Sequence, residues 1–249
     1  MIDLHGRTAL VTGGAKGIGR GISVALAAEG AAVAVNYATD PQAAERTVAE
    51  IVGHGGRAVA LAGDVGSPAD VERLFDQAGA ALGPVDTLVN NAARYSFQPL
   101  EEITPDEFER QYRTNVLGVF LTCQAFVRQV PVAGGSIVNI STSGIASNTP
   151  GSALHTSTKG AVTTLTRVLA NELGPRHIRV NAVAAGATDT EGARNLGLIN
   201  DENVARAVAA TPLGRLGQPR DIGRVVAFLA SAEAAWITGD VLFASGGLR

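Results

Sequence analysis

The sequence places a histidine and a lysine four residues apart in a segment that favours a helix. These residues are His155 and Lys159, and one helical turn brings such positions onto the same face. An imidazole exchanges protons near neutral pH, because its ordinary pKa is about 6.5. A lysine ammonium one turn away disfavours the imidazolium, so we expect His155 to be mostly neutral. The pair is therefore a candidate for proton transfer to or from a bound substrate.

Lysine is scarce in this chain, and its two positions are therefore informative. The 20 basic residues comprise 18 arginines and only Lys16 and Lys159. Lysine carries a compact ammonium group that can titrate, whereas arginine stays charged. We therefore treat both lysines as candidate functional residues.

A glycine-rich segment lies between the first apolar run and the first helical pattern. It consists of Thr12, Gly13, Gly14, Ala15, Lys16, Gly17, Ile18 and Gly19. Glycines allow a tight turn and a close backbone approach to a pyrophosphate, and the N–H groups of a following helix favour that anion. The segment predicts a dinucleotide site at the end of the first strand.

The rest of the chain alternates between strand-like and helix-like segments. Strands are expected at 8–11, 31–37, 58–62, 87–90, 136–140, 178–183 and 241–244, and helices at 18–28, 41–52, 67–82, 105–130, 155–172 and 220–231. Strands separated by helices form a mostly parallel sheet with helices on both faces. We therefore expect one doubly wound α/β domain, a Rossmann fold, over residues 1–249, with ligands at the carboxyl ends of the strands. The pattern weakens in the polar, Gly-rich sequence from 187 to 203, which we expect to belong to a mobile substrate lid at about 187–216.

Composition and charge argue against several classes of partner. A net charge of -3 without basic clusters offers no site for nucleic acid or anionic lipid. The chain has no apolar run long enough for a membrane span and no signal-peptide pattern, so we expect a cytoplasmic protein. The single Cys123 lies in an apolar run and is expected to be a buried hydrophobe. His5, His54 and His177 fall in separate elements, which argues against a metal site and leaves a small molecule as the expected partner.

The spacing of the glycine-rich segment resembles the T-G-x-x-x-G-x-G motif of the short-chain dehydrogenase/reductase family, including members such as the 3-oxoacyl-ACP reductases. Further segments resemble the family in order: Asp64-Val65, Asn90 to Ala93, Asn115, Ala185-Gly186 with Thr188 and Thr190, Ile237 to Asp240, and Ser245 to Gly247. Ala93 and Ala185 replace the usual Gly and Pro. The resemblance implies a nicotinamide-dependent oxidoreductase that interconverts a carbonyl and a secondary alcohol, working as a homo-oligomer (tetramer or dimer). It assigns the cofactor to Gly13, Ala15, Lys16, Gly17, Ile18, Gly19, Asn36, Asp64, Val65, Asn91, Ala92, Lys159, Gly186, Thr188 and Thr190.

Charge near the end of the second strand bears on the choice of cofactor. An acidic residue there would pair with the ribose 2′-hydroxyl of NAD and repel a 2′-phosphate, whereas this chain has the neutral Asn36. Lys16 can supply a positive charge to that phosphate. We therefore expect NADP(H) as the preferred cofactor and NAD(H) as the alternative, although Ala38 stands where NADP-binding relatives often carry Arg.

The resemblance also implies a catalytic group, in which one residue departs from the family. The family places a Tyr four residues before the Lys, and this chain has His155 there. Thirteen positions before His155, Thr142 replaces the family's Ser. By resemblance, Thr142 orients the substrate oxygen, His155 handles its proton, Lys159 fixes the ribose and tunes His155, and Asn115 supports the proton relay. No register shift of this motif brings Tyr95 or Tyr112 into the missing position.

Three interpretations of His155 remain open. It is a working acid or base, in hydride transfer or in a non-redox reaction; or it silences an ordinary reductase; or the chain is a non-enzyme that kept nucleotide binding for assembly or regulation. Because a neutral imidazole is a better base than acid, we expect carbonyl reduction to suffer more than alcohol oxidation. The residues expected to border the substrate pocket are Arg94, Ser96, Phe97, Ala146 and the segment 191–198.

Overall fold

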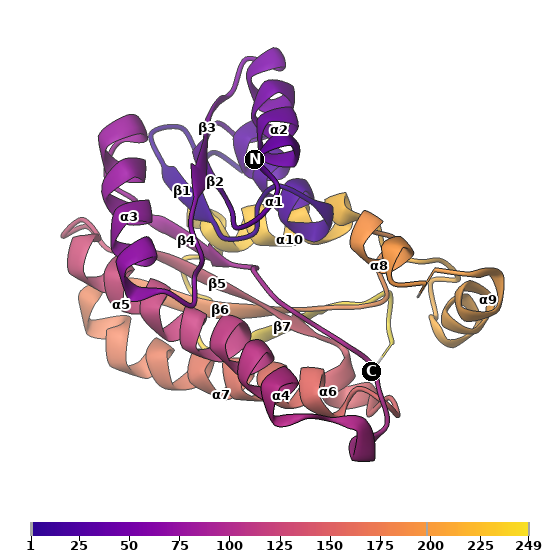
Figure 1. The fold of residues 1–249 in the computed structure, drawn as a ribbon. Helices are drawn as coiled ribbons and strands as arrows, with labels where there is room; N and C mark the ends of the chain where they lie inside the picture. The colour runs from indigo at the N-terminus through magenta and orange to yellow at the C-terminus, as the bar shows by residue number, and fades with distance from the viewer. Residues whose placement is uncertain (1, 198, 249) are drawn as a thin grey trace.

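The structure is a computed structural model that describes residues 2–197 and 199–248. In this part of the chain seven parallel strands form one sheet, in the order β3-β2-β1-β4-β5-β6-β7 (Figure 1). The strands are β1 (Thr8–Val11), β2 (Ala32–Tyr37), β3 (Arg57–Ala62), β4 (Thr87–Asn90), β5 (Gly135–Thr142), β6 (Ile178–Ala185) and β7 (Val241–Ala244). The winding reverses between β1 and β4, which creates the crevice where such sheets bind ligands. The expected single-domain, doubly wound fold is confirmed.

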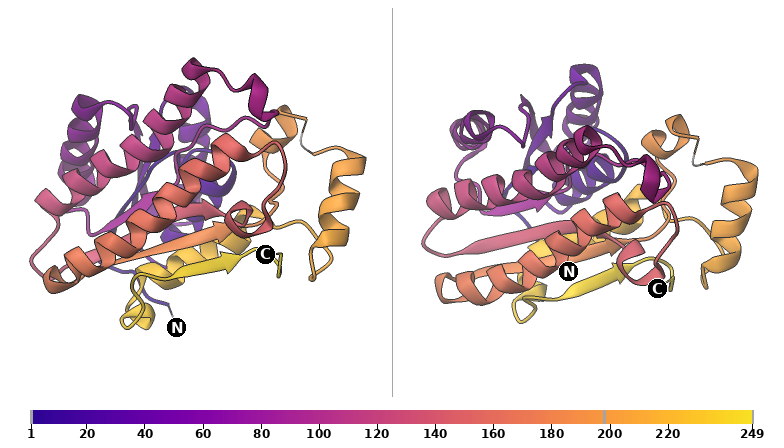
Figure 2. Two further views of the ribbon diagram at one scale, coloured as in Figure 1. Left: turned by 90° about the horizontal axis from the view of Figure 1, so that it is seen from below. Right: turned by 60° about the horizontal axis from the view of Figure 1, so that its bottom comes forward.

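Helices cover both faces of the sheet (Figures 1 and 2). One face carries α1 (Gly17–Ala28), α2 (Pro41–Gly53) and α10 (Pro219–Ala230), and the other carries α3 (Pro68–Leu82), α5 (Gly118–Gln129) and α7 (Ala153–Leu173). Successive strand residues point to opposite faces, so Leu10 and Val11 of β1 enter two different cores. Burial on both faces explains why the strands are continuous apolar runs rather than alternating ones.

The helix expected at 105–130 is interrupted in the structure. It consists of α4 (Pro105–Tyr112), a π-helical turn η2 (Arg113–Leu117) and α5. The buried Asn115 lies in the π turn, and such turns occur where a helix adapts to a functional or packing demand. The apolar periodicity predicted the helix but not the break, because one extra residue in a turn changes the period only locally.

The segment 187–203, where the sequence pattern weakens, contains helices that the sequence did not predict. It contains α8 (Glu191–Asn195) and the start of α9 (Asp201–Ala210), and α9 projects from the body of the molecule in Figures 1 and 2. Side-chain oxygens cap the two helices and compensate for their weak apolar patterns; the capping residues are Thr190 and Asn200. Leu198, which was expected to border the pocket, lies outside the described residues.

Short elements complete the fold. They are the 3-10 turns η1 (Leu100–Glu102), η3 (Gly174–Arg176) and η4 (Ala232–Ala234) and the helical turn α6 (Gly144–Ser147). Within residues 2–197 and 199–248, no helix combines the length and the apolar character that a membrane crossing requires.

Candidate active site

The glycine-rich segment forms the turn between β1 and α1. Gly13 and Gly17 have φ angles of 60° and 50°, which favour glycine. A Cβ atom on Gly19 would lie 2.1 Å from the carbonyl oxygen of Gly13, so a side chain cannot be accommodated there. The first turn of α1 contains no acidic residue and no side chain caps it, so its N–H groups face no competing anion from the helix itself. The turn therefore has the geometry that a pyrophosphate requires.

The motif after β4 holds this turn in place. The Asn91 side-chain amide donates to the carbonyl oxygens of Thr12 and Gly13, at 2.9 and 3.0 Å. In return, the Thr12 hydroxyl accepts the backbone N–H groups of Asn91 and Ala92, at 2.9 and 3.0 Å. Asn91 and Ala92 thus lie beside the predicted cofactor site and fix the glycine turn to the centre of the sheet.

The environment of Asn36 corrects its expected role. The sequence treated Asn36 as a neutral residue facing the ribose, but its side chain is buried. Its Oδ1 accepts the N–H of Gly13 at 3.1 Å, and its Nδ2 donates to the carbonyl oxygen of Gly63 at 3.0 Å. Asn36 therefore supports the glycine turn from inside the fold.

Lys16 is also less free than expected. Its ammonium pairs with the carboxylate of Asp40, and this contact lowers the pKa of Asp40. Asp40 also caps α2 by accepting the N–H of Ala43 at 2.9 Å. The Lys16 charge that we expected to serve a 2′-phosphate is therefore partly neutralised within the chain.

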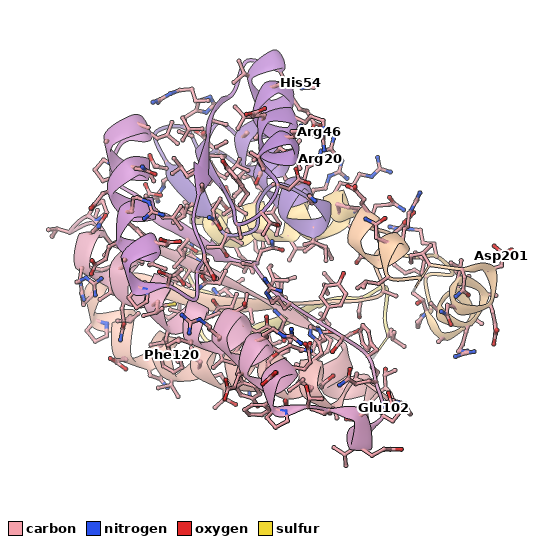
Figure 3. All side chains as sticks on the ribbon, in the orientation of Figure 1. Arg20, Arg46, His54, Glu102, Phe120 and Asp201 are labelled. Atoms are coloured by element: carbon pink, nitrogen blue, oxygen red, sulfur yellow. The ribbon has the colours of Figure 1, made fainter. Side chains whose placement is uncertain are left out.

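A cavity of about 740 Å³ adjoins the glycine turn beside Lys16. Arginines from three helices line it: Arg194 on α8, and Arg20 on α1 and Arg46 on α2, which Figure 3 labels. The Arg20 guanidinium is paired with Glu50 at 2.6 Å. The cavity thus places both basic and acidic side chains beside the glycine turn.

The remaining predicted cofactor residues lie around the same edge of the sheet. Asp64 is exposed at the end of β3, and its Oδ1 accepts the N–H of Gly66 at 2.9 Å, while Val65 is buried. Asp64 thus stabilises a turn through its side chain. Because Asp64 is exposed, its carboxylate also remains open to a ligand. Ala15 and Ile18 belong to the glycine turn and the start of α1.

The segment after β6 approaches the glycine turn from the opposite side. The Thr188 hydroxyl donates to the carbonyl oxygen of Gly186 at 2.9 Å. The Thr190 side chain lies 3.3 Å from the position that a Cβ on Gly17 would occupy. Gly186, Thr188 and Thr190 therefore connect the end of β6 to the predicted pyrophosphate site.

Lys159 and Thr142 come together where β5 ends against α7. Lys159 is buried, and its Nζ donates to the carbonyl oxygen of Ile140 at 2.8 Å. Burial lowers the pKa of Lys159 to about 8, so the ammonium is mostly charged at neutral pH. Thr142 is the last residue of β5, and its Oγ1 accepts the N–H of Gly144 at 3.2 Å. The Thr142 hydroxyl keeps its own proton available for a substrate oxygen.

His155 lies in the first turn of α7, one turn before Lys159. Burial, with a smaller contribution from the Lys159 charge, lowers the pKa of His155 to about 4. The expectation that His155 is neutral agrees with this direction, although the larger cause is desolvation, which the spacing could not show. Its Nδ1 is buried without a hydrogen-bond partner among the described residues. At neutral pH the imidazole is thus a poor source of protons.

Asn115 is fully engaged by neighbouring groups. Its Oδ1 accepts the N–H of Arg94, and its Nδ2 donates to the carbonyl oxygen of the same residue, both at 2.8 Å. The Nδ2 also donates to the Thr158 hydroxyl at 3.1 Å. The side chain of Asn115 therefore clamps the loop after β4 onto α7, which places it beside the catalytic helix as expected.

Tyr95 is the residue that sequence reasoning missed. Its ring centroid lies 5.7 Å from that of His155, and the Phe97 centroid lies 5.9 Å from His155. Phe97 had been expected at the pocket, whereas Tyr95 was considered only as a shifted partner within the helix motif. The sequence signal that could have identified Tyr95 was its position shortly after β4. Strand β4 ends at the crevice, so the residues that follow it lie near the site. Two aromatic rings therefore flank His155.

Other candidate groups carry no chemistry. Burial raises the pKa of the Cys123 thiol to about 12, in keeping with its expected role as a small hydrophobe. Among the described residues, no three His, Cys, Asp or Glu side chains are grouped so that they could hold a metal ion.

Known proteins match this chain over a region that includes all of the predicted site residues. The family model described as "Enoyl-(Acyl carrier protein) reductase" matches residues 13–249. The chain is 47% identical to an uncharacterized oxidoreductase of Methylorubrum extorquens, with both proteins covered completely. It is 38% identical to a protein of Zymoseptoria tritici named "Probable tetrahydroxynaphthalene reductase", covering 98% of this chain and 94% of that protein. The structure of a blue fluorescent protein from a metagenomic library, in complex with NADPH, superimposes with a TM-score of 0.91 at 37% identity and covers 99% of each chain.

Proposed function

The chain belongs to the short-chain dehydrogenase/reductase family of nicotinamide-dependent oxidoreductases, and we propose that it interconverts a carbonyl and a secondary alcohol with NADP(H). The observation that carries the proposal is the meeting of the glycine turn, Thr142 and the buried Lys159 at one edge of the sheet. The bound nicotinamide would supply or accept a hydride. Thr142 would orient the substrate oxygen, and the Lys159 ammonium would hold the ribose.

The residues present fit a dinucleotide. Gly19 lets α1 begin directly against the Gly13 carbonyl oxygen, where a side chain cannot fit, and no side chain caps the N–H groups at the N-terminus of α1. Lys16 supports NADP(H), since a 2′-phosphate carries more charge than the single carboxylate of Asp40 and can compete for the ammonium. If the ion pair between Lys16 and Asp40 is kept when the cofactor binds, the Asp40 carboxylate favours NAD(H) instead. We propose NADP(H) as the preferred cofactor and NAD(H) as the weaker one.

We propose a flat, fused-ring aromatic ketone as the substrate class. The rings of Tyr95 and Phe97 lie 6.1 Å apart at an interplanar angle of 64°, and Phe97 is 45% exposed. Such faces favour an aromatic ligand over a sugar, because rings stack or meet edge to face. The name of the relative from Zymoseptoria tritici, a tetrahydroxynaphthalene reductase, supports the same class.

NADPH oxidation with a ketone panel tests the proposal. The panel contains 2-tetralone as a fused-ring ketone, cyclohexanone as a matched aliphatic ring and a 3-oxoacyl thioester. The unmodified chain and its His155→Tyr variant are compared with NADPH and with NADH. We expect turnover with NADPH and a preference for 2-tetralone. Preference for the thioester would contradict the substrate class, and equal rates with NADH would contradict the cofactor preference.

One observation favours a second candidate function, a nucleotide-binding member without turnover. His155 replaces the family's catalytic Tyr, and its lowered pKa of about 4 makes it a poor acid and a weak base. This candidate predicts NADPH binding without oxidation of NADPH by any ketone. Activity that appears only in the His155→Tyr variant would identify a silenced reductase.

We also propose that the chain works as a homo-oligomer. Helices α4, α5 and α7 and the turn η2 expose large apolar side chains, and Figure 3 labels one of them, Phe120; the others are Phe108, Leu117 and Val168. Covering these side chains would remove apolar surface from water. Sedimentation velocity distinguishes a tetramer or dimer from a monomer. The cytoplasmic location stays a prediction of the sequence.

A further inference from the structure

The proposed reduction lacks an evident proton donor. A carbonyl that receives a hydride becomes an alkoxide and must be protonated. The position that the family gives to a phenol holds His155, whose imidazole is neutral and has a buried, unpartnered Nδ1. Lys159 is engaged with the carbonyl oxygen of Ile140, and Thr142 has an alcohol hydroxyl that is a weak acid. A phenol that replaces the missing one must therefore come from another element.

Tyr95 brings a phenol to this place from the loop after β4. Its ring lies 5.7 Å from the imidazole of His155, centroid to centroid. Its Oη lies 3.1 Å from the position that a Cβ on Gly192 would occupy, so the hydroxyl faces the start of α8. Among the described residues no hydrogen-bond partner occupies this hydroxyl. The phenol thus stands between the catalytic helix and the lid segment 187–216, with its proton uncommitted.

The backbone on which Tyr95 sits is held firmly. The two 2.8 Å hydrogen bonds of Asn115 fix both the N–H and the carbonyl of Arg94, the residue immediately before Tyr95. Asn115 is itself fully buried in the π-helical turn and anchored to Thr158 of α7. Buried hydrogen bonds to the residue before Tyr95 limit the movement of its backbone and so preorganise the phenol for proton transfer. Asn115 therefore acts as a positioning residue for Tyr95.

We propose that Tyr95 is the proton donor of this enzyme and replaces the phenol that is missing at position 155. This inference rests on the proposed function. Bound NADPH would supply a hydride to the carbonyl carbon and be left as NADP⁺. As the C=O π bond breaks, the Tyr95 O–H bond breaks and its proton forms the new O–H bond of the alcohol. The phenolate left on Tyr95 recovers a proton from water when the product leaves.

The environment of Tyr95 sets the favoured direction of the reaction. Burial raises the pKa of Tyr95, and no cation is among the groups that shift it. The phenol therefore stays protonated at working pH, which suits an acid and not a base. Carbonyl reduction is favoured over alcohol oxidation, which reverses the direction expected from His155 alone.

Five proteins test the proposal: the unmodified chain, Tyr95→Phe, Tyr112→Phe, His155→Tyr and the double variant Tyr95→Phe/His155→Tyr. Tyr112 is the matched control, because its hydroxyl bonds to Ser157 on the outer side of α7 at 3.2 Å and the substitution removes the same single atom. Reduction of 2-tetralone gives kcat and KM between pH 6 and 9, and NADPH fluorescence gives the dissociation constant of the cofactor.

We expect Tyr95→Phe to lower kcat about 100-fold, the usual contribution of a general acid, with KM and the NADPH dissociation constant within about threefold. Tyr112→Phe should keep its kcat. The double variant should recover activity, because it returns a phenol to position 155. If Tyr95 had only a structural role, the new phenol would not restore the activity.

Four outcomes would overturn the proposal. Tyr95→Phe could retain more than a third of kcat, or the double variant could fail to recover while still binding NADPH. The unmodified chain could also be inactive while His155→Tyr alone is active, which leaves the proposed reductase scaffold standing but removes Tyr95 as donor. If no variant turns over yet all bind NADPH, both the donor and the proposed function are wrong.

Discussion

The buried imidazole of His155 makes the stability of the protein depend on pH in a calculable way. Its pKa is about 4 in the folded chain, against an ordinary value near 6.5. As pH falls below 6.5, the unfolded state binds a proton at this position and the folded state does not. The unfolded state is therefore favoured, and stability is lost as pH falls from about 6.5 towards 4. Between pH 7 and pH 5 these two pKa values predict a loss of about 2 kcal/mol from His155.

Urea unfolding followed by circular dichroism measures this loss. The unmodified chain and His155→Gln are compared at pH 7 and pH 5 at one protein concentration, because other titrating groups contribute equally and cancel in the difference. We expect the unmodified chain to lose about 2 kcal/mol more than the variant. If the two losses agree within about 0.5 kcal/mol, the imidazole is not desolvated and the argument that it cannot serve as an acid is wrong.

Three further predictions concern the cofactor edge and the loop clamp. Asp40→Ser keeps a cap for α2 but frees the ammonium of Lys16. The affinity for NADPH, measured by fluorescence, should therefore rise about fourfold relative to the affinity for NADH. An unchanged ratio of the two affinities would show that the ion pair does not limit phosphate binding. Gly19→Ala places a methyl group 2.1 Å from a carbonyl oxygen of the glycine turn, so NADPH binding should be lost and Tm lowered by about 5 °C or more; normal binding would contradict the turn geometry. Asn115→Leu removes three hydrogen bonds and should cost about 2 kcal/mol in urea unfolding, with Arg94 left unclamped; a neutral result would remove Asn115 as a positioning residue.

Local sequence patterns were sufficient for most of the fold. Alternating strands and helices predicted the parallel sheet, and observed boundaries differ from the expected ones by one or two residues in most elements, as for α7, which begins at Ala153 instead of His155. The π-helical turn around Asn115 and the helix α8 were not predicted. Both depend on hydrogen bonds rather than on apolar periodicity, so the pattern of hydrophobic residues carries little trace of them.

The candidate site was only partly predictable. The glycine turn, Thr142 and Lys159 were found because their spacing is fixed by one turn, one strand end and one helix. Asn36 was placed at the right strand end but on the wrong side of it, since only the tertiary structure shows its side chain turning inwards to Gly13. The Lys16 charge was identified without its partner, because Asp40 lies in a different element.

What the sequence determined by itself is the backbone scaffold and the positions that need special geometry, because periodicity, glycine placement and residue spacing act over one or two turns. What only the tertiary structure decided is the chemistry of the site. The protonation state of His155 follows from burial by residues distant in sequence, and the phenol of Tyr95 reaches it from a loop sixty positions earlier. Desolvation and proximity belong to the packed fold, so neither could be obtained from the spacing of residues along the chain.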